Sequence, residues 1–229
     1  MRGPSVHVSA GRRRIIRLRN AACIAAAAVV LLVLARNSTG DHGSPTAHRL
    51  ERTGGAVHLA WPREGEAAVA VEGLGGLGTS GGDAPVPIAS LAKVMTAYLV
   101  LKDHPLEPGQ EGFRIRVTPA DVEDLHRRLA LGQSVVEVEV GEMLSERQAL
   151  EALLLPSANN VAALLAVHEA GGVEAFVAEM NEAAAELGMG KTHYTDPSGF
   201  EDTTVSTAAD QLRIGRAAMA DPTFAQIVA

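Results

Sequence analysis

The sequence predicts an α+β protein in which a cluster of helices is combined with part of an antiparallel sheet. Hydrophobic residues make up 47% of the 229-residue chain but aromatic residues only 3%, so we expect an alanine-rich, helix-heavy core. Helix-capping signals recur through residues 118–222, whereas alternating apolar residues form short segments, mainly on the N-terminal side. The helices are therefore expected at the centre of the fold.

The N-terminal 53 residues have the composition of an export signal followed by a linker. Five arginines within residues 12–19 precede an uninterrupted apolar run at residues 21–35, the order of a basic n-region and an apolar h-region. The run is shorter than the roughly 20 residues that span a bilayer. We expect residues 1–20 to be a basic cytoplasmic segment, residues 21–35 a signal peptide or membrane anchor, and residues 36–53 a linker.

Two outcomes stay open for this segment. Small residues at Val33 and Ala35 have the spacing that a signal peptidase reads, so cleavage near Ala35 would release the protein to the cell wall or the medium. An uncleaved span over residues 15–35 would instead anchor it in the cytoplasmic membrane, facing outward. Either outcome predicts an exported protein.

Composition also limits the cofactors and partners. The only cysteine, Cys23, lies in the apolar run, so neither a disulfide framework nor a cysteine metal site is expected. The eight histidines never occur as H-x-x-x-H or H-E-x-x-H, so we predict no metal site and no cofactor. The net charge of -7 argues against a nucleic-acid partner.

The first elements of the globular part are expected to be strands. Residues 56–60 and 67–71 are predicted to form a hairpin around a turn at residues 62–65. Residues 73–82 contain six glycines and are predicted to be a loop. A helix is then expected to begin near Ser90.

Alternating apolar residues predict two more strands, at residues 113–117 and 136–140. Local capping signals predict the helices that follow: an N-cap with proline behind it, a capping box, or a glycine stop. These helices are expected over residues 118–129, from Ser145 to the Leu155-Pro156 pair, over residues 159–170, in a segment that reaches residue 187, and from Thr207 to just before the Asp221-Pro222 pair.

Ser90 and Lys93 stand three positions apart at the start of an apolar stretch, residues 87–101. On a helix that begins near Ser90, residues i and i+3 share a face, so the hydroxyl and the ammonium point the same way. An N-cap serine and a solvated lysine would be the ordinary explanation. However, the helix is apolar nearly all round, and a lysine in such a helix favours a functional role. An amine with a pKa lowered by burial can take the proton of a serine nucleophile.

A second polar cluster lies between two apolar segments, where Ser157 and Asn159 follow Pro156. Serine and asparagine after proline are routine helix caps. Their occurrence downstream of the Ser90 and Lys93 pair favours a functional site, because S-x-x-K followed by S-x-N is the active-site signature of penicillin-binding proteins and serine β-lactamases.

These two segments, residues 87–97 and 154–162, closely resemble the D-alanyl-D-alanine carboxypeptidases, the low-molecular-mass penicillin-binding proteins of peptidase family S11. Further matches follow in the family's order at residues 140–142, 176–181, 187–189 and 195–200. The resemblance implies a β-lactamase/transpeptidase-like fold for residues 54–229. It also implies a substrate, the peptidoglycan stem peptide ending in D-Ala-D-Ala, and acylation by β-lactams.

The resemblance implies a role for each matched side chain. Ser90 would be the acylated nucleophile, Lys93 the base that activates it, and Ser157 the relay of a proton to the leaving group. Asn159 would hold a carbonyl or amide of the substrate. Asn160 stands where many relatives have aspartate, and an amide keeps the hydrogen bonding there while losing the charge.

The family's third motif, Lys-Thr/Ser-Gly on a strand, is not matched. Lys191, Thr192 and His193 come nearest but lack the glycine, and the resemblance places the motif beyond Ala229. The sequence therefore predicts a truncated carboxypeptidase-like domain without its C-terminal strands and with impaired activity. Two alternatives stay open: a non-catalytic remnant that binds peptidoglycan or a cell-wall partner and, less favoured, a β-lactamase.

Overall fold

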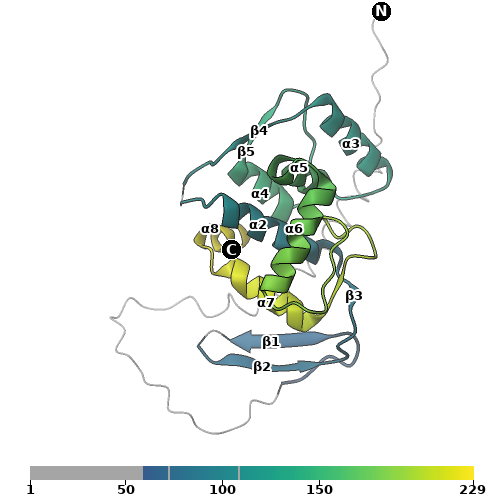
Figure 1. The fold of residues 1–229 in the computed structure, drawn as a ribbon, viewed down its shortest axis with the longest axis vertical. Coiled ribbons are helices and arrows are strands. Elements are labelled where there is room, and N and C mark those ends of the chain that lie inside the picture. Colours follow the sequence, from purple (N-terminus) through teal and green to yellow (C-terminus); the bar gives the residue numbers. More distant parts are fainter. Residues whose placement is uncertain (1–58, 72, 108) are drawn as a thin grey trace, which may run out of the picture. The chain divides into compact units, whose positions relative to one another are not determined.

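The computed structural model describes residues 59–71, 73–107 and 109–229, which belong to one compact unit, Val57–Ala229. The predicted n-region, the signal or anchor and the linker lie outside the described residues. Along the chain the elements are β1 (Ala67–Val71), β2 (Gly75–Ser80), β3 (Val86–Pro87), the 3-10 turn η1 (Ala89–Leu91), α2 (Ala92–Asp103), β4 (Arg114–Arg116), α3 (Pro119–Ala130), β5 (Met143–Ser145), α4 (Glu146–Leu154), α5 (Asn159–Ala170), α6 (Val173–Glu186), β6 (Val205–Ser206), α7 (Ala208–Met219) and α8 (Pro222–Val228) (Figure 1).

Helix α2 is the centre of the unit. It packs against α4, α5, α6, α7 and α8, and most of its residues are buried (Figure 1). Its two sides belong to two different cores, one that includes Val100, Leu150 and Leu165, and one that includes Met95 and Phe176. Because burying one such large side chain contributes about 1.5 to 3 kcal/mol, α2 is held firmly from all directions.

The predicted helix starts are confirmed where the signal is local. Thr118 and Asp121 form a capping box at the start of α3, and Ser145 forms another with Gln148 at the start of α4. Helix α5 ends at Gly171, which adopts a left-handed conformation with φ of 74°. These bonds satisfy backbone groups that the helix itself leaves unpaired, so the sequence alone is enough to set the helix ends.

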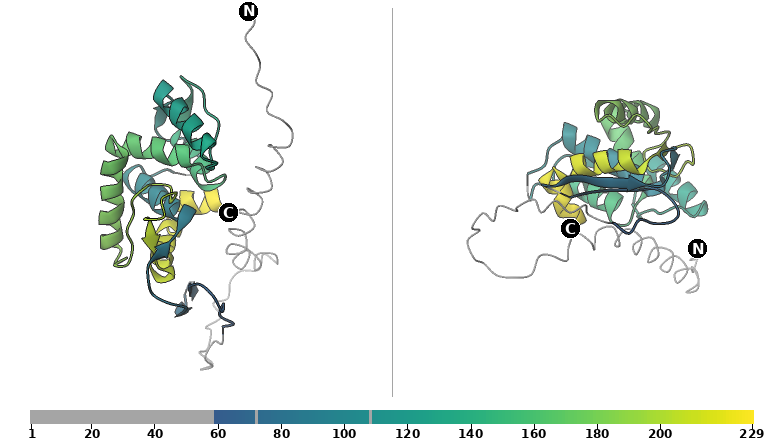
Figure 2. Two further views of the ribbon diagram at one scale, coloured as in Figure 1. Left: turned by 90° about the vertical axis from the view of Figure 1, so that its right-hand side faces the viewer. Right: turned by 90° about the horizontal axis from the view of Figure 1, so that it is seen from below.

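The strands form three separate antiparallel pairs: β1 with β2, β3 with β6, and β4 with β5. Strand 67–71 is confirmed, but its predicted partner is wrong, because β1 pairs with the glycine-rich segment Gly75–Ser80. Residues 59 and 60 of the predicted partner are not in a strand, and residues 56–58 lie outside the described part. The β1–β2 hairpin packs against α7, as two further views show (Figure 2).

Two other expectations are corrected. Residues 136–140 are not a strand: the backbone N–H and carbonyl of Val136 bond to the side chain of Asn160, and β4 takes Met143–Ser145 as its partner. The Asp221-Pro222 pair ends α7 as expected, but it also starts α8, because the Asp221 carboxylate accepts from the N–H groups of Thr223 and Phe224.

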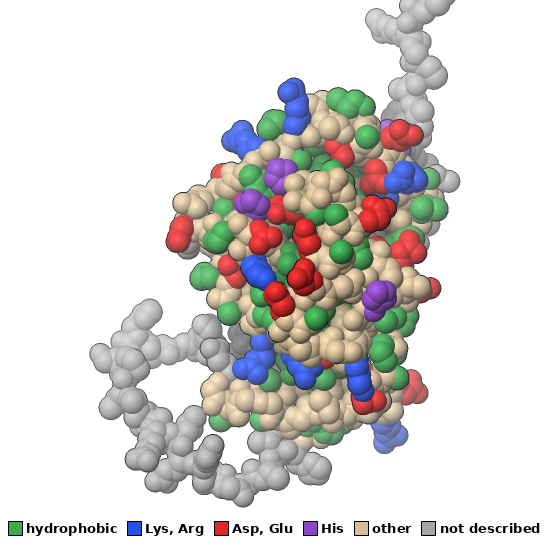
Figure 3. All heavy atoms as spheres, viewed as in Figure 1, with side chains coloured by type: hydrophobic (Ala, Val, Ile, Leu, Met, Phe, Trp, Pro, Cys, Tyr) green, Lys and Arg blue, Asp and Glu red, His purple; other side chains and the backbone are tan. Residues whose placement is uncertain are grey.

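The surface around α6 is acidic. Asp and Glu side chains gather there (Figure 3), and the exposed glutamates of α6 are Glu174, Glu182 and Glu186. Within the described residues, no single helix is long and apolar enough to cross a membrane; α5 and α6, bent by 85°, satisfy the criteria only as a pair.

Candidate active site

Ser90 lies in η1, one turn before α2, and its side chain is exposed. The turn is held in place from outside the helix: Ala89 has a φ of 47°, in the left-handed region that L residues rarely adopt, and its carbonyl lies against Gly199. Such a conformation costs about 1 to 3 kcal/mol and persists only where the surroundings impose it. The backbone before Ser90 is thus fixed by the loop that carries Gly199.

Lys93 is almost fully buried, with 2% of its surface exposed. Its Nζ donates to Ser90 Oγ at 3.2 Å and to the carbonyl oxygen of Ser198 at 2.9 Å. The spacing of three positions therefore places the amine and the hydroxyl on one face, as predicted. The carbonyl of Ser198 fixes the direction of the amine.

The surroundings of Lys93 disfavour the charged form of its amine. Burial and, to a smaller extent, the charge of Arg128 act against the attraction of Asp196 and together lower the pKa of Lys93 from 10.5 to about 8. A group with a pKa near 8 is partly neutral at physiological pH, whereas an ordinary lysine is almost fully charged. The neutral amine has the lone pair that a general base needs.

Ser157 brings a second hydroxyl to the same point. It lies between α4 and α5 with a φ of 62°, and its Oγ donates to Ser90 Oγ at 2.9 Å. Ser90, Lys93 and Ser157, which lie on two distant segments of the chain, are therefore brought together.

Asn159 lies at the first residue of α5 and is 6% exposed. Its Nδ2 donates to Gln133 Oε1 at 2.9 Å, and its backbone N–H donates to the carbonyl of Ser134 at 2.8 Å. Among the described residues, no hydrogen bond joins its side chain to Ser90, Lys93 or Ser157. Asn159 thus stands beside the serine and lysine cluster, held by its own partner.

The loop over residues 196–199 takes part in the site, and residue-type reasoning did not select it. Besides the contacts of Ser198 and Gly199, Pro197 accepts from Thr96 Oγ1 at 2.7 Å through its carbonyl. Residues 195–200 are among the family matches, but two of the contacts of this loop are made by the backbone carbonyls of Pro197 and Ser198. Residue type carries no signal for such contacts.

Asp196 holds this loop together. Its carboxylate accepts from the backbone N–H and hydroxyl of Ser198, from Phe200 N–H and from the hydroxyl of Thr204. Burial alone would raise the pKa of Asp196, but these hydrogen bonds outweigh burial and keep its pKa below the usual value. An ionised carboxylate therefore stands near Lys93.

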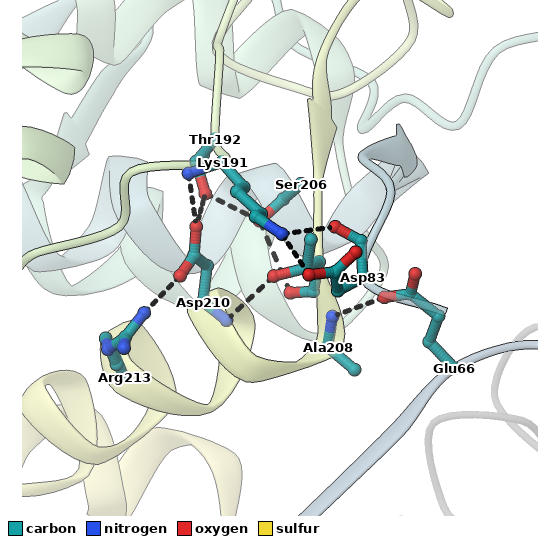
Figure 4. Close-up of polar contacts among 9 residues, drawn as sticks. Glu66, Asp83, Lys191, Thr192, Ser206, Ala208, Asp210 and Arg213 are labelled. Carbon is teal, nitrogen blue, oxygen red and sulfur yellow. Dashed lines mark hydrogen bonds and ion pairs between the residues drawn. The ribbon is translucent and has the colours of Figure 1, made fainter. Parts of the chain in front are cut away.

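The segment from Lys191 to His193 contacts α7 and the residues before β3. Lys191 forms an ion pair with Asp83, and Thr192 Oγ1 donates to Asp210 at 3.0 Å (Figure 4). Asp210 also binds Arg213 within α7. These contacts give the side chains of Lys191 and Thr192 structural partners outside the Ser90 site.

The arrangement suits acyl transfer: an exposed hydroxyl, a buried amine of lowered pKa, and a second hydroxyl that bonds to the first. Within the described part of the chain, no group of three or more His, Cys, Asp or Glu side chains is placed to hold a metal ion.

Comparison with known proteins points to one family. The family model of the D-alanyl-D-alanine carboxypeptidases matches residues 64–228. A D-alanyl-D-alanine carboxypeptidase of Mycobacterium tuberculosis is 40% identical over 146 residues, which cover 62% of this chain and 46% of that protein. A D-alanyl-D-alanine endopeptidase of Pseudomonas aeruginosa is 37% identical, with 63% and 43% covered. The chain thus spans about half the length of the curated relatives it matches.

Solved structures agree with the sequence comparison. A crystal structure of D-alanyl-D-alanine carboxypeptidase from Mycobacterium tuberculosis has a TM-score of 0.59 and 36% identity, covering 71% of this chain and 58% of that one. The DD-transpeptidase of a Streptomyces strain has a TM-score of 0.62 and 27% identity, covering 71% and 63%. These similarities confirm the predicted α+β, β-lactamase/transpeptidase-like fold.

Proposed function

Because the chain belongs to the D-alanyl-D-alanine carboxypeptidase family, we propose that it acts as a serine-type D-Ala-D-Ala carboxypeptidase on peptidoglycan stem peptides, through an acyl-enzyme on Ser90. The observation that carries the proposal is the direct contact of Ser90 Oγ with both Lys93 Nζ and Ser157 Oγ. The base and the proton relay are thereby each within hydrogen-bond reach of the nucleophile.

The proposed reaction has two steps. The neutral amine of Lys93 takes the Ser90 proton while Oγ attacks the carbonyl carbon between the two D-alanines. The proton that Lys93 took reaches the departing nitrogen through the hydroxyl of Ser157, so the C–N bond breaks, free D-alanine leaves and an ester to Ser90 remains, with Lys93 neutral again. Water, giving up a proton to Lys93, then attacks this ester; the acyl C–O bond breaks, the shortened peptide leaves with a new carboxyl group, and Lys93 returns the proton to Ser90 Oγ. A β-lactam would acylate the same oxygen by opening its ring.

Labelling of the full chain with a fluorescent penicillin tests the proposal. We expect a covalent adduct in the wild type and none in Ser90→Ala. Ser80→Ala is the matched control: its hydroxyl is buried in β2 with no hydrogen-bond partner among the described residues, so its loss should leave labelling unchanged. Release of D-alanine from a peptide ending in D-Ala-D-Ala, measured on the same variants, tests turnover.

The alternatives give different results. Folded wild-type protein without an adduct would favour a non-catalytic protein that binds peptidoglycan or a cell-wall partner. Rapid release of hydrolysed penicillin would favour a β-lactamase. A stable adduct that Ser90→Ala abolishes supports the carboxypeptidase.

We further propose that the protein is exported and anchored by residues 15–35, or released after cleavage near Ala35. The support is the order of the arginines and the apolar run in the sequence. Degradation of the body by protease added to intact cells, or its presence in the medium, is the expected result. Full protection of the body in intact cells would contradict export.

A further inference from the structure

Gln133 joins helix α3 to the candidate substrate-binding asparagine. Its Oε1 accepts from Arg128 at 3.2 Å and from Asn159 Nδ2 at 2.9 Å. Arg128 lies near the end of α3, and its guanidinium is fixed in turn by an ion pair with Asp124. A continuous chain of hydrogen bonds therefore runs from Asp124 through Arg128 and Gln133 to Asn159.

The backbone around Gln133 is attached to the same end of α5. Asn159 N–H donates to the carbonyl of Ser134, and the Asn160 side chain bonds to both the N–H and the carbonyl of Val136, at 3.1 and 2.9 Å. Gln133 therefore cannot move far from Asn159. The end of the Gln133 amide that points toward Asn159, oxygen or NH2 group, therefore determines which end of the Asn159 amide can bond to it.

Arg128 determines the orientation of the Gln133 side-chain amide. A guanidinium has donors only, so Gln133 has to turn its oxygen, not its NH2 group, toward Arg128. The same oxygen faces Asn159, and only the Nδ2 end of Asn159 can donate to it. The orientation of the Asn159 amide is thus set by Arg128 through Gln133. The Oδ1 atom of Asn159 points away from Gln133.

Arg128 also acts on the base. Its positive charge is one of the causes that lower the pKa of Lys93, after burial and against Asp196. Asp124, on α3 itself, partly offsets that charge through the ion pair. The charged groups that bear on Lys93 are therefore Asp196 from the 196–199 loop and Arg128 from α3.

We propose that Arg128 and Gln133 are positioning residues of the Ser90 site: Arg128 orients the Gln133 amide, and Gln133 orients Asn159 for substrate. The inference rests on the proposed function. The hydrogen bonds carry it, and the positive charge of Arg128 adds a separate readout, so different variants are expected to have different effects.

Gln133 variants test the geometry. In Gln133→Met, which has no acceptor of comparable strength, we expect KM for a peptide ending in D-Ala-D-Ala to rise about five- to tenfold. The pH at which acylation by penicillin is half-maximal should stay unchanged. Gln133→Glu keeps an acceptor for both donors and should restore most of the affinity.

Arg128 variants separate charge from geometry. Arg128→Gln removes a positive charge near Lys93, so the pH midpoint of acylation should move upward and the rate at pH 7 should fall. Arg128→Lys keeps the charge but not the planar fork, so KM should rise while the midpoint stays near that of the wild type. Arg127→Gln is the matched control, because Arg127 pairs with the same Asp124 on the exposed side and should change neither quantity.

The outcomes are distinguishable. Wild-type acylation with KM unchanged in Gln133→Met and the midpoint unmoved in Arg128→Gln would overturn the inference and leave the proposed function standing. Absence of acylation in the folded wild type would overturn both. Thermal unfolding of each variant identifies any that fails to fold. If Gln133→Met does, an unchanged KM in Arg128→Lys overturns the inference instead.

Discussion

The protonation state of Lys93 determines whether the proposed nucleophile is active. Burial holds its pKa at about 8, and the amine acts as a base only when neutral. We therefore expect the rate of acylation by penicillin to rise with pH, to reach half its maximum near pH 8 and to level off above it. An unperturbed lysine would place this midpoint near 10.4. Stopped-flow acylation rates between pH 6 and 10 measure it, and a flat profile would exclude Lys93 as the base.

Gly199, in the 196–199 loop, lies against the backbone just before the nucleophile, with no room for a side-chain atom. Its φ is 72°, and a Cβ built on it would collide with the carbonyl of Ala89, the residue before Ser90. We expect Gly199→Ala to lower the melting temperature and to slow acylation of Ser90, because the collision forces the turn to shift.

The matched control for this substitution is Gly188→Ala. Gly188 has nearly the same φ, 70°, but a Cβ there meets nothing within 4 Å. Both variants carry the conformational cost of a left-handed alanine, about 1 kcal/mol, and only Gly199→Ala adds the collision. Equal melting temperatures and equal acylation rates in the two variants would show that the close approach to Ala89 has no influence on the site.

At the scale of elements, the sequence was informative wherever the stabilising contact is local. The caps at Thr118, Ser145 and Thr207 each lie three residues from their bonding partners, so the helix starts follow from the sequence. Strand partners depend on distant residues. Val136 resembles a strand residue, yet its backbone groups bond to the Asn160 side chain, and no local pattern reveals that competition.

Helix α4 begins with a buried acid, Glu146, which is 1% exposed. Its Oε2 accepts from Phe113 N–H at 3.4 Å, and its Oε1 has no partner among the described residues. Burial raises the pKa of Glu146 to about 7, although the Phe113 N–H and His104 act in the opposite direction. Since the folded state holds this proton more tightly than the unfolded state, stability should fall as pH rises from about 4.5 to about 7.

Substitution of this acid tests that pH dependence. Glu146→Gln keeps an acceptor for Phe113 N–H and removes the buried charge, so we expect a melting temperature about 2 to 4 °C above wild type at pH 8 and little difference at pH 5. Glu151→Gln, a substitution of the same kind in the same helix, is the control. A gain of equal size at both pH values would mean that ionisation of Glu146 is not the cause.

At the scale of the whole unit, the site could be predicted only in part. Ser90 and Lys93 lie within one turn, so their contact follows from spacing. The contact of Ser157 with Ser90 spans 67 positions and was expected from the family resemblance rather than from any local rule. Gln133 and the carbonyl of Ser198 were not expected, because their parts depend on tertiary contacts and not on residue type.

The β1–β2 hairpin is the least anchored part of the described unit. Among the described residues, neither buried core includes one before Ile88. The contacts that hold the hairpin include its packing on α7 and the bond from Ala208 N–H to the carboxylate of Glu66, just before β1, at 3.1 Å. An isolated two-stranded sheet is marginally stable in water. We therefore expect hydrogen exchange to show the hairpin opening on its own, well before α2 is exposed.

The hydrogen bond from Ala208 N–H to Glu66 provides a direct test of how the hairpin is held. Glu66→Ala leaves the first N–H of α7 without its acceptor, so exchange should become faster in β1, in β2 and at the start of α7, while α2 keeps its protection. Glu64→Ala, two positions away and exposed, is the matched control and should leave the exchange pattern unchanged. If the hairpin and α2 instead exchange at one common rate in both variants, the unit unfolds as a single cooperative body and the hairpin is as firmly held as the helices around Lys93.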